Sequence, residues 1–230
     1  MEPKQPKTFQ WMLDPPALPL TIPDDPAARQ TAWQAVKSGS GGNFCTHRLK
    51  RVKPSQLEFK ISPAALLFGG LPVLIGLFFG VLWGYYLCNS SDWLSLLPLF
   101  FSLFIIALGL FLLWLEMRPI VFDAEAKQYW ADRRRQPAAS RECHRDRAAF
   151  ETIRALQILP KFISNSRNAY YSYELNLVLN NGRRLNIVDH GRLKPLRQDA
   201  AALATFLAVP LWDGTRTGGP DSRTASEFAG

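Results

Sequence analysis

Cysteine is scarce in this 230-residue chain, and its three copies are too scattered to organise a fold. Cys45, Cys88 and Cys143 are odd in number, which excludes a complete disulfide framework. Cys45 with His47, and Cys143 with His144, lack zinc-finger spacing and lie among basic residues that repel a cation. We therefore predict no metal site and no cofactor.

Catalytic motifs are missing as well. The sequence has no Gly-rich phosphate loop, no metal-ligand cluster and no nucleophile elbow. Asp189-His190-Gly191 superficially suggests an acid–base pair, but adjacent strand residues point to opposite faces of a sheet. We expect a turn-capping Asp and a surface His there. The sequence thus predicts that the protein is not an enzyme.

Charge is absent from two long stretches. No Lys, Arg, Asp or Glu occurs in Ile61–Cys88, and Trp93–Met117 has only Glu116, near its end. Each stretch exceeds the roughly 20 apolar residues that cross a bilayer as a helix. Only Asn89-Ser90-Ser91-Asp92 separates them. We predict a transmembrane helical hairpin over residues 61–117, with both flanks on one side of the membrane.

Basic residues lie on both outer flanks of this hairpin and not in its turn. By the positive-inside rule, both termini face the cytoplasm. No apolar segment precedes residue 61, so we expect no cleaved signal peptide. The basic flanks comprise Arg48, Lys50, Arg51, Lys53 and Lys60 before the hairpin, and Arg118, Lys127 and Arg133–Arg135 after it.

The net charge of +8 and a pI near 9.6 favour anionic membrane lipids over nucleic acid, because no nucleic-acid recognition motif accompanies the charge. A densely charged loop carries the candidate lipid- or anion-binding residues; a plain solvated loop is the alternative. These candidates are Arg133, Arg134, Arg135, Arg141, Arg145 and Arg147.

Small residues recur in the first span at Gly76, Gly80 and Gly84. Glycines four apart form a groove on one helix face, where a second helix backbone can approach closely. The partner helix is either the second span of the same hairpin or a helix of another subunit. The motif therefore leaves a homo-oligomer open.

The flanks divide into four further segments. Residues 1–43 are expected to form a flexible Pro-rich arm with one short helix around Ala27–Val36. Trp11, Leu13 and Leu18 in this arm are candidate partner-binding residues; incidental apolar residues in a mobile tail are the alternative. Residues 44–60 supply strands, 118–212 the main part of a domain, and 213–230 a disordered tail.

Alternating patterns predict the elements of that domain. A helix follows from the spacing of Leu196, Ala200, Leu203 and Leu207, with Pro195 in its first turn and Pro210 ending it. The strands are expected at Phe44–Val52, Leu57–Ile61, Ile120–Phe122, Gln128–Ala131, Phe150–Leu159, Tyr170–Leu179 and Arg183–Asp189.

Face parity predicts the turn between the last two strands. A two-residue Asn181-Gly182 turn would put Leu185 and Ile187 on the face opposite Leu175 and Leu177. A three-residue loop with Gly182 in the left-handed region unites the apolar face. It pairs Leu179 with Arg183, Leu177 with Leu185 and Leu175 with Ile187, and we predict this loop with a G1-type bulge.

The order of Ile120–Asp123, Ile153–Ile158, Tyr173–Val178, Asn181-Gly182 and a closing helix resembles bacterial two-span inner-membrane proteins. In these proteins the hairpin interrupts a pleckstrin-homology-like cytoplasmic domain. The resemblance implies an α+β membrane protein: a two-helix transmembrane hairpin plus a small antiparallel β domain with a C-terminal helix. It implies binding or scaffolding rather than chemistry.

Three functions fit this architecture. The first is an accessory, assembly or scaffold subunit that binds a protein partner in the membrane or cytoplasm. The second is an immunity protein that neutralises a membrane-acting toxin. The third is a membrane regulator that binds anionic lipid. Each needs only an anchor and a surface, so the residues alone do not separate them.

Overall fold

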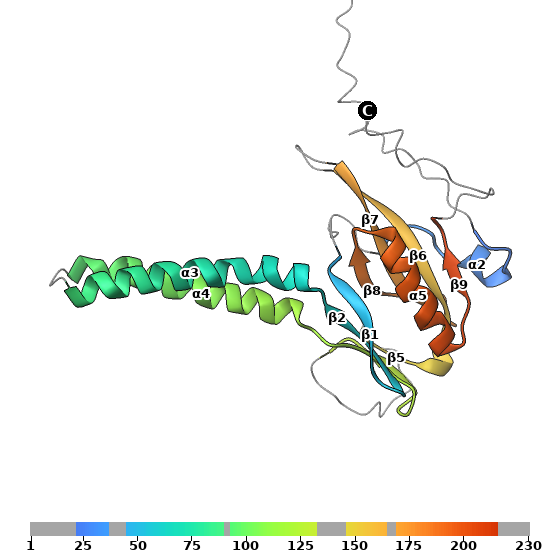
Figure 1. Ribbon diagram of the computed structural model, residues 1–230. Coiled ribbons are helices and arrows are strands. Elements are labelled where there is room, and N and C mark those ends of the chain that lie inside the picture. The colour runs from blue at the N-terminus through green and yellow to red at the C-terminus, as the bar shows by residue number, and fades with distance from the viewer. Residues whose placement is uncertain (1–21, 37–44, 90–92, 133–145, 165–168, 216–230) are drawn as a thin grey trace, which may run out of the picture. The chain divides into compact units, whose positions relative to one another are not determined.

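The computed structural model describes residues 22–36, 45–89, 93–132, 146–164 and 169–215 (Figure 1). The chain forms two compact units that interleave along the sequence. One unit is Cys45–Ser140, and the other combines Met1–Phe44 with Arg141–Gly230. The predicted combination of two long apolar helices, antiparallel sheets and a C-terminal helix is confirmed.

The first unit, Cys45–Ser140, is a helical hairpin inserted into a small antiparallel sheet. Its strands pair in the order β1-β2-β3-β4, and the two apolar helices separate β2 from β3 in sequence. The elements are β1 (His47–Lys53), β2 (Gln56–Ile61), α3 (Pro63–Asn89), η1 (Trp93–Ser95), α4 (Leu96–Glu116), β3 (Ile120–Asp123) and β4 (Gln128–Trp130).

The two apolar helices differ in where they carry proline. Pro72 lies inside α3, whereas Pro98 lies in the first turn of α4, where a proline costs no helical hydrogen bond. At the sheet end, β2 buries alternate residues, Leu57 and Phe59, whereas all four residues of β3 are buried. Phe122 packs against Phe59 and Tyr129, with ring centroids 6.4 and 4.9 Å apart.

The second unit contains the sheet β8-β7-β6-β9 and α5. β9 joins β6 in parallel, and the other pairs are antiparallel. The predicted strand at Phe150–Leu159 is shifted: a 3-10 turn occupies Phe150–Thr152. The elements are α2 (Pro26–Gln30), β5 (Arg147–Ala149), η2 (Phe150–Thr152), β6 (Ile153–Ser164), β7 (Ala169–Leu179), β8 (Arg184–His190), α5 (Leu193–Leu207) and β9 (Leu211–Asp213).

The loop between β7 and β8 has the predicted three residues. Leu179 N–H donates to the Arg183 carbonyl oxygen at 2.9 Å, and Gly182 has φ +78°. Leu177 pairs with Leu185 as expected. The expected pairing of Leu175 with Ile187 is wrong, because a bulge lets Leu175 pair with Val188.

Two predictions about ends of segments differ from the structure. Residues 22–36 of the predicted flexible arm are ordered and include the five-residue helix α2. Asp213, placed in the predicted disordered tail, belongs to β9 and is buried. Residues 216–230 lie outside the described residues.

Candidate functional sites

Glycines let the two apolar helices approach closely. A Cβ atom added at Gly76 would lie 2.7 Å from Ile106 Cγ1 and 3.0 Å from the Ser102 carbonyl oxygen on α4. A Cβ atom at Gly109 of α4 would lie 2.7 Å from Val73 Cγ2 on α3. Small residues at such contacts allow two helix backbones to pack together. Gly76 and Gly109 thus serve the contact inside the hairpin.

The other two glycines of the predicted motif, Gly80 and Gly84, are not closely packed against α4. A Cβ atom at Gly80 would meet Ser102 Cβ at 3.7 Å, which is ordinary van der Waals contact. At Gly84 it would meet no heavy atom of the described chain within 4 Å. The second span of the same hairpin is therefore the partner of Gly76. A contact of Gly84 with another subunit stays a prediction.

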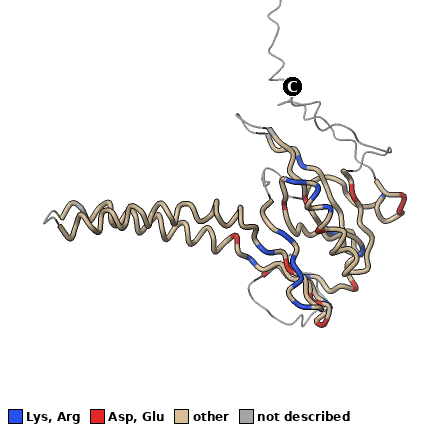
Figure 2. The backbone as a smooth tube through the Cα atoms, viewed as in Figure 1, with Lys and Arg blue, Asp and Glu red and all other residues tan. Residues whose placement is uncertain are grey.

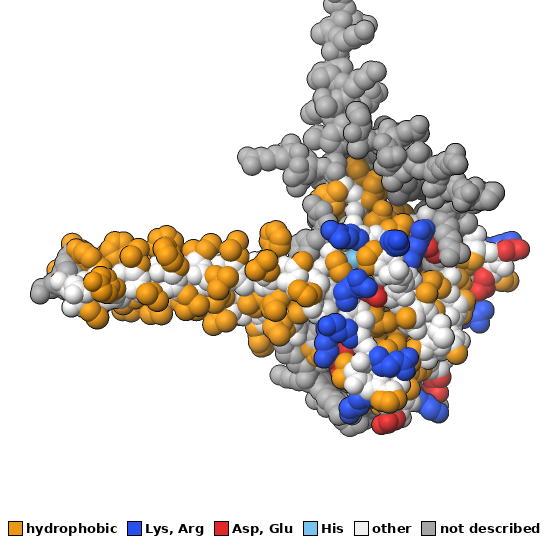
Figure 3. All heavy atoms as spheres, viewed as in Figure 1, with side chains coloured by type: hydrophobic (Ala, Val, Ile, Leu, Met, Phe, Trp, Pro, Cys, Tyr) orange, Lys and Arg blue, Asp and Glu red, His pale blue; other side chains and the backbone are white. Residues whose placement is uncertain are grey.

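The outer surface of the hairpin is apolar along its length. Phe68, Val81, Phe100 and Phe104 are each more than 60% exposed. Figure 3 shows hydrophobic side chains along the whole hairpin, and Figure 2 shows no Lys or Arg on either helix. Both helices are long and apolar enough to cross a membrane. A contiguous exposed apolar surface marks a site of contact with a membrane or another protein.

Basic residues gather on β1 and β2, next to the base of the hairpin (Figure 2). Arg48 lies directly opposite Lys60 in the β1–β2 pair. Like charges in directly opposed positions repel each other. Glu58 offsets part of this charge, with its Oε2 3.6 Å from Lys60 Nζ. Arg118 is exposed just after α4 ends.

The sheet β8-β7-β6-β9 has two faces of different chemistry. One face carries Leu156, Ile158, Leu175 and Leu177, and α5 contacts β6, β7 and β9. The opposite face, which we call the polar sheet face, carries hydrogen-bonding and charged side chains in register across three strands. These residues are Gln157, Lys161, Ser172, Glu174, Asn176, Arg184, Asn186 and Asp189.

Charged groups are buried and paired on the polar sheet face. Lys161 Nζ lies 3.0 Å from Glu174 Oε1 and 3.4 Å from Asp189 Oδ2. The Lys161 and Glu174 side chains are only 4% and 0% exposed. Asn176 Nδ2 donates to Glu174 Oε2 at 3.4 Å, and Asn186 Nδ2 donates to Asp189 Oδ1 at 3.1 Å. Burying these charges is tolerable only because each has such partners.

The N-terminal segment, residues 22–36, contributes main-chain groups to this face. Its side chains at Ala32, Gln34 and Val36 are exposed, while the main chain of the same three residues is hydrogen-bonded to the sheet. Gln157 Nε2 donates to the Ala32 carbonyl oxygen (3.2 Å), Arg184 Nη1 donates to the Gln34 carbonyl oxygen (2.6 Å), and Val36 N–H donates to Glu174 Oε2 (2.7 Å).

Arg184 contacts both the N-terminal segment and the polar sheet face. Its Nη1 also lies 3.4 Å from Gln157 Oε1. Burial lowers the pKa of Arg184 from its ordinary value, and the Glu174 carboxylate opposes that shift. A guanidinium remains charged in proteins, so its bonds to neutral carbonyls are charge-assisted and stronger than neutral ones.

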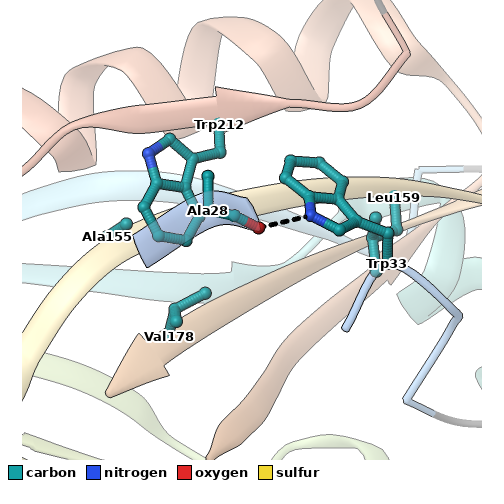
Figure 4. Close-up of a cluster of buried hydrophobic side chains, with 6 residues drawn as sticks. All are labelled: Ala28, Trp33, Ala155, Leu159, Val178 and Trp212. Carbon is teal, nitrogen blue, oxygen red and sulfur yellow. Dashed lines mark hydrogen bonds between the residues drawn. The ribbon is translucent and has the colours of Figure 1, made fainter. Parts of the chain in front are cut away.

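A tryptophan of the N-terminal segment is buried in an apolar cluster (Figure 4). Trp33 is 8% exposed, and its ring centroid lies 6.4 Å from that of Trp212 on β9. Trp33 Nε1 donates to the Ala28 carbonyl oxygen at 2.8 Å, which satisfies the indole N–H inside the cluster. The full cluster is Ala28, Trp33, Ala155, Leu159, Val178 and Trp212.

The segment fits closely against the end of β9. A Cβ atom added at Gly214 would lie 3.0 Å from Trp33 Cζ3 and 3.1 Å from the Ile158 carbonyl oxygen. Gly214 N–H donates to that same carbonyl at 3.0 Å. A side chain at this position would require the indole ring or the sheet backbone to shift by a few tenths of an ångström.

Some residues singled out by sequence lie outside the described residues. These are Trp11, Leu13 and Leu18, together with Arg133, Arg134, Arg135, Arg141 and Arg145. Arg147 begins β5 and is half-buried.

The expected surface His is corrected. His190 is fully buried, and its Nδ1 accepts a hydrogen bond from Arg192 N–H at 3.1 Å. Asp189 pairs with Lys161. The side chains of Asp189 and His190 point to opposite faces of the sheet, as expected for adjacent strand residues. Asp189 lies opposite Glu174 on β7, and His190 lies opposite Tyr173.

Sequence reasoning missed the polar sheet face. Glu174, Asn176 and Asn186 alternate with apolar residues, which is the usual pattern of a strand with one solvated face. The signal available in the sequence was Trp33, because a large aromatic residue seldom stands in a purely solvated arm.

Comparisons with protein families, curated proteins and solved structures found no match to this chain.

Proposed function

We propose that the protein is an integral protein of a bacterial inner membrane and acts as an accessory, assembly or scaffold subunit of a larger membrane complex. In this proposal the hairpin crosses the bilayer twice, and both termini are cytoplasmic. The sheets and α5 form a non-enzymatic, pleckstrin-homology-like binding domain at the membrane surface. The large apolar surface of the hairpin and the basic residues at its base support this topology.

The observation that carries the proposal is the short connection between helices and sheet. β2 ends at Ile61 and α3 begins at Pro63, while α4 ends at Glu116 and β3 begins at Ile120. β2 and β3 are paired neighbours in one sheet. The two helices therefore leave adjacent strands with almost no linker, which would hold that sheet at the bilayer surface.

The helix lengths agree with a double crossing. At about 1.5 Å per residue, the 27 residues of α3 and the 21 residues of α4 extend roughly 40 and 31 Å. The hydrocarbon core of a bilayer is about 30 Å thick. Trp93 and Trp114 lie near the two ends of the second apolar stretch, where aromatic residues anchor helices at the interface.

Purification of the tagged full-length protein from native membranes in mild detergent, with cross-linking and mass spectrometry, tests this function. We expect a stoichiometric membrane partner cross-linked to the hairpin or to the sheet domain. Recovery of the protein alone, under conditions that retain known complexes of the same membrane, would contradict the accessory-subunit proposal.

The basic residues on β1 and β2 favour a second function, binding of anionic lipid. The opposed Arg48 and Lys60 place two like charges together, and a headgroup phosphate would relieve their repulsion. Binding of the full-length protein to lipid nanodiscs or vesicles containing anionic lipid should then weaken as salt rises. The Arg48→Ala/Lys60→Ala variant should show a weaker salt dependence, because Lys50, Arg51 and Lys53 remain. Salt-independent binding by the unmodified protein would reject this function.

A further inference from the structure

The N-terminal segment contacts the polar sheet face as a bound peptide would. Its residues 31–36 belong to no strand, so within the described chain they are not part of the sheet. Sheet side chains instead contact the main chain at every second residue, from 32 to 36. This pattern is independent of the side chains at Ala32, Gln34 and Val36, which point to solvent.

Specificity in this contact comes from two buried side chains. Ala28 is 0% exposed and Trp33 is 8% exposed, and both belong to the cluster around Trp212. An aromatic anchor in a desolvated pocket, surrounded by main-chain hydrogen bonds, is the usual arrangement of a high-affinity peptide contact. The face therefore fits an extended peptide that carries a tryptophan, with a small residue five positions before it.

The chemistry of the polar sheet face also suggests recognition rather than simple covering. The same face also carries Ala155, Leu159 and Val178, which pack against Trp33, so the segment covers an apolar part and a charged part of the sheet. Covering the charged part is costly, because Lys161 and Glu174 are desolvated. Here the charged groups point their remaining hydrogen-bonding capacity at a main chain. Glu174 accepts from Val36 N–H, and Arg184 donates to the Gln34 carbonyl.

We propose that the polar sheet face is a peptide-binding site, that residues 22–36 occupy it as an intramolecular ligand, and that a tryptophan-containing peptide of a partner protein displaces them. This proposal deepens the binding function proposed above and names its site. The segment and the sheet belong to the same compact unit of one chain. An intramolecular ligand competes at a higher effective concentration than a free peptide, so the closed form should dominate without a partner.

A labelled synthetic peptide of residues 22–36 tests the site by fluorescence anisotropy with the full-length protein in detergent. The unmodified chain should bind it weakly, because its own segment occupies the site. The Trp33→Ala chain should bind the same peptide at least tenfold more tightly. A peptide with Trp33→Ala should bind neither protein.

Two substitutions on the sheet give a matched pair. In the Trp33→Ala chain, Arg184→Ala should weaken peptide binding at least tenfold, because a charge-assisted hydrogen bond to the peptide main chain is lost. Arg183→Ala, one residue earlier in the exposed hairpin loop, should change binding less than twofold. Equal peptide binding by the unmodified and Trp33→Ala chains, or an equal effect of the two arginine substitutions, would overturn the proposal.

A cleavable chain keeps the test decisive if Trp33→Ala fails to fold. Replacing Ser38–Gly42 with a protease recognition sequence allows the segment to be cut from the folded protein. After cleavage, excess peptide should displace the fragment within hours, and the sheet should keep its circular dichroism. A fragment that never exchanges, or a sheet that unfolds when the fragment leaves, would identify the segment as a permanent part of the fold.

The two experiments can fail independently. If a stoichiometric partner is recovered from native membranes but the peptide does not exchange, only the peptide-binding site is rejected. If the peptide exchanges but no partner is recovered, only the accessory-subunit proposal is rejected.

Discussion

At the scale of single residues, the polar sheet face shows how the protein tolerates buried charge. Lys161 has two carboxylates within 3.4 Å, and the more deeply buried of them, Glu174, also accepts a main-chain N–H. Removing one partner leaves the other charge buried without compensation, which costs far more than the pair contributes. The face is therefore sensitive to single substitutions and more tolerant of paired ones.

We predict that Lys161→Met lowers the free energy of unfolding by about 3–5 kcal/mol, because Glu174 is left buried and charged. The double variant Lys161→Met/Glu174→Leu should be less destabilised than Lys161→Met. Denaturant titration in detergent, followed by tryptophan fluorescence, measures both. Lys194→Met is the control, since Lys194 is exposed on α5, and it should change stability by less than about 0.5 kcal/mol.

A second prediction concerns Tyr173, whose pKa is raised by burial, although Arg197 opposes the shift. A folded-state pKa above the unfolded value of about 10 means that the folded protein keeps a proton that the unfolded chain loses. The contribution to stability is therefore complete below pH 10 and is lost as pH rises through the folded pKa. Tyr173→Phe should reduce the alkaline loss of stability; an unchanged pH profile between pH 9 and 11 would contradict this.

At the scale of secondary-structure elements, the two apolar helices depend on close backbone contact at Gly76 and Gly109. We predict that Gly76→Val lowers the melting temperature of the detergent-solubilised protein, because its side chain would collide with Ile106 and the backbone at Ser102. Gly70→Val is the matched control and should leave the melting temperature unchanged, since no described atom lies within 4 Å of its Cβ position. A larger effect of Gly84→Val than of Gly70→Val would instead indicate contact with another subunit.

The elements also show how far the sequence predicts the structure. Charge-free runs predict the two helices well, and parity predicts the loop at Gly182, because both follow from local periodicity. The bulge at Ile187 and the parallel strand β9 depend on contacts between distant residues, so local patterns do not reveal them. The polar sheet face was hidden because an alternating strand looks the same whether water or another segment covers its polar side.

At the scale of the whole molecule, the proposed topology places Cys88 and Cys45 on opposite sides of the membrane. Cys88 is exposed near the end of α3, and Cys45 lies just before β1. In intact cells made permeable only at the outer membrane, a membrane-impermeant maleimide should label a chain whose only cysteine is Cys88. A chain with Cys45 alone should be labelled only after lysis. The reverse pattern would contradict the proposed orientation.

The interleaving of the two units has a consequence for biosynthesis. Trp33 and Trp212 meet in one cluster, although 179 positions separate them in the chain. At about 5–20 residues per second, the ribosome needs roughly 9–36 s to make the intervening chain. Both apolar stretches leave the ribosome in that interval, so the Trp33–Trp212 cluster closes only after the hairpin has been synthesised. Burial of Trp33 would then mark the end of assembly, and a chain stalled at insertion would expose this tryptophan to chaperones and proteases.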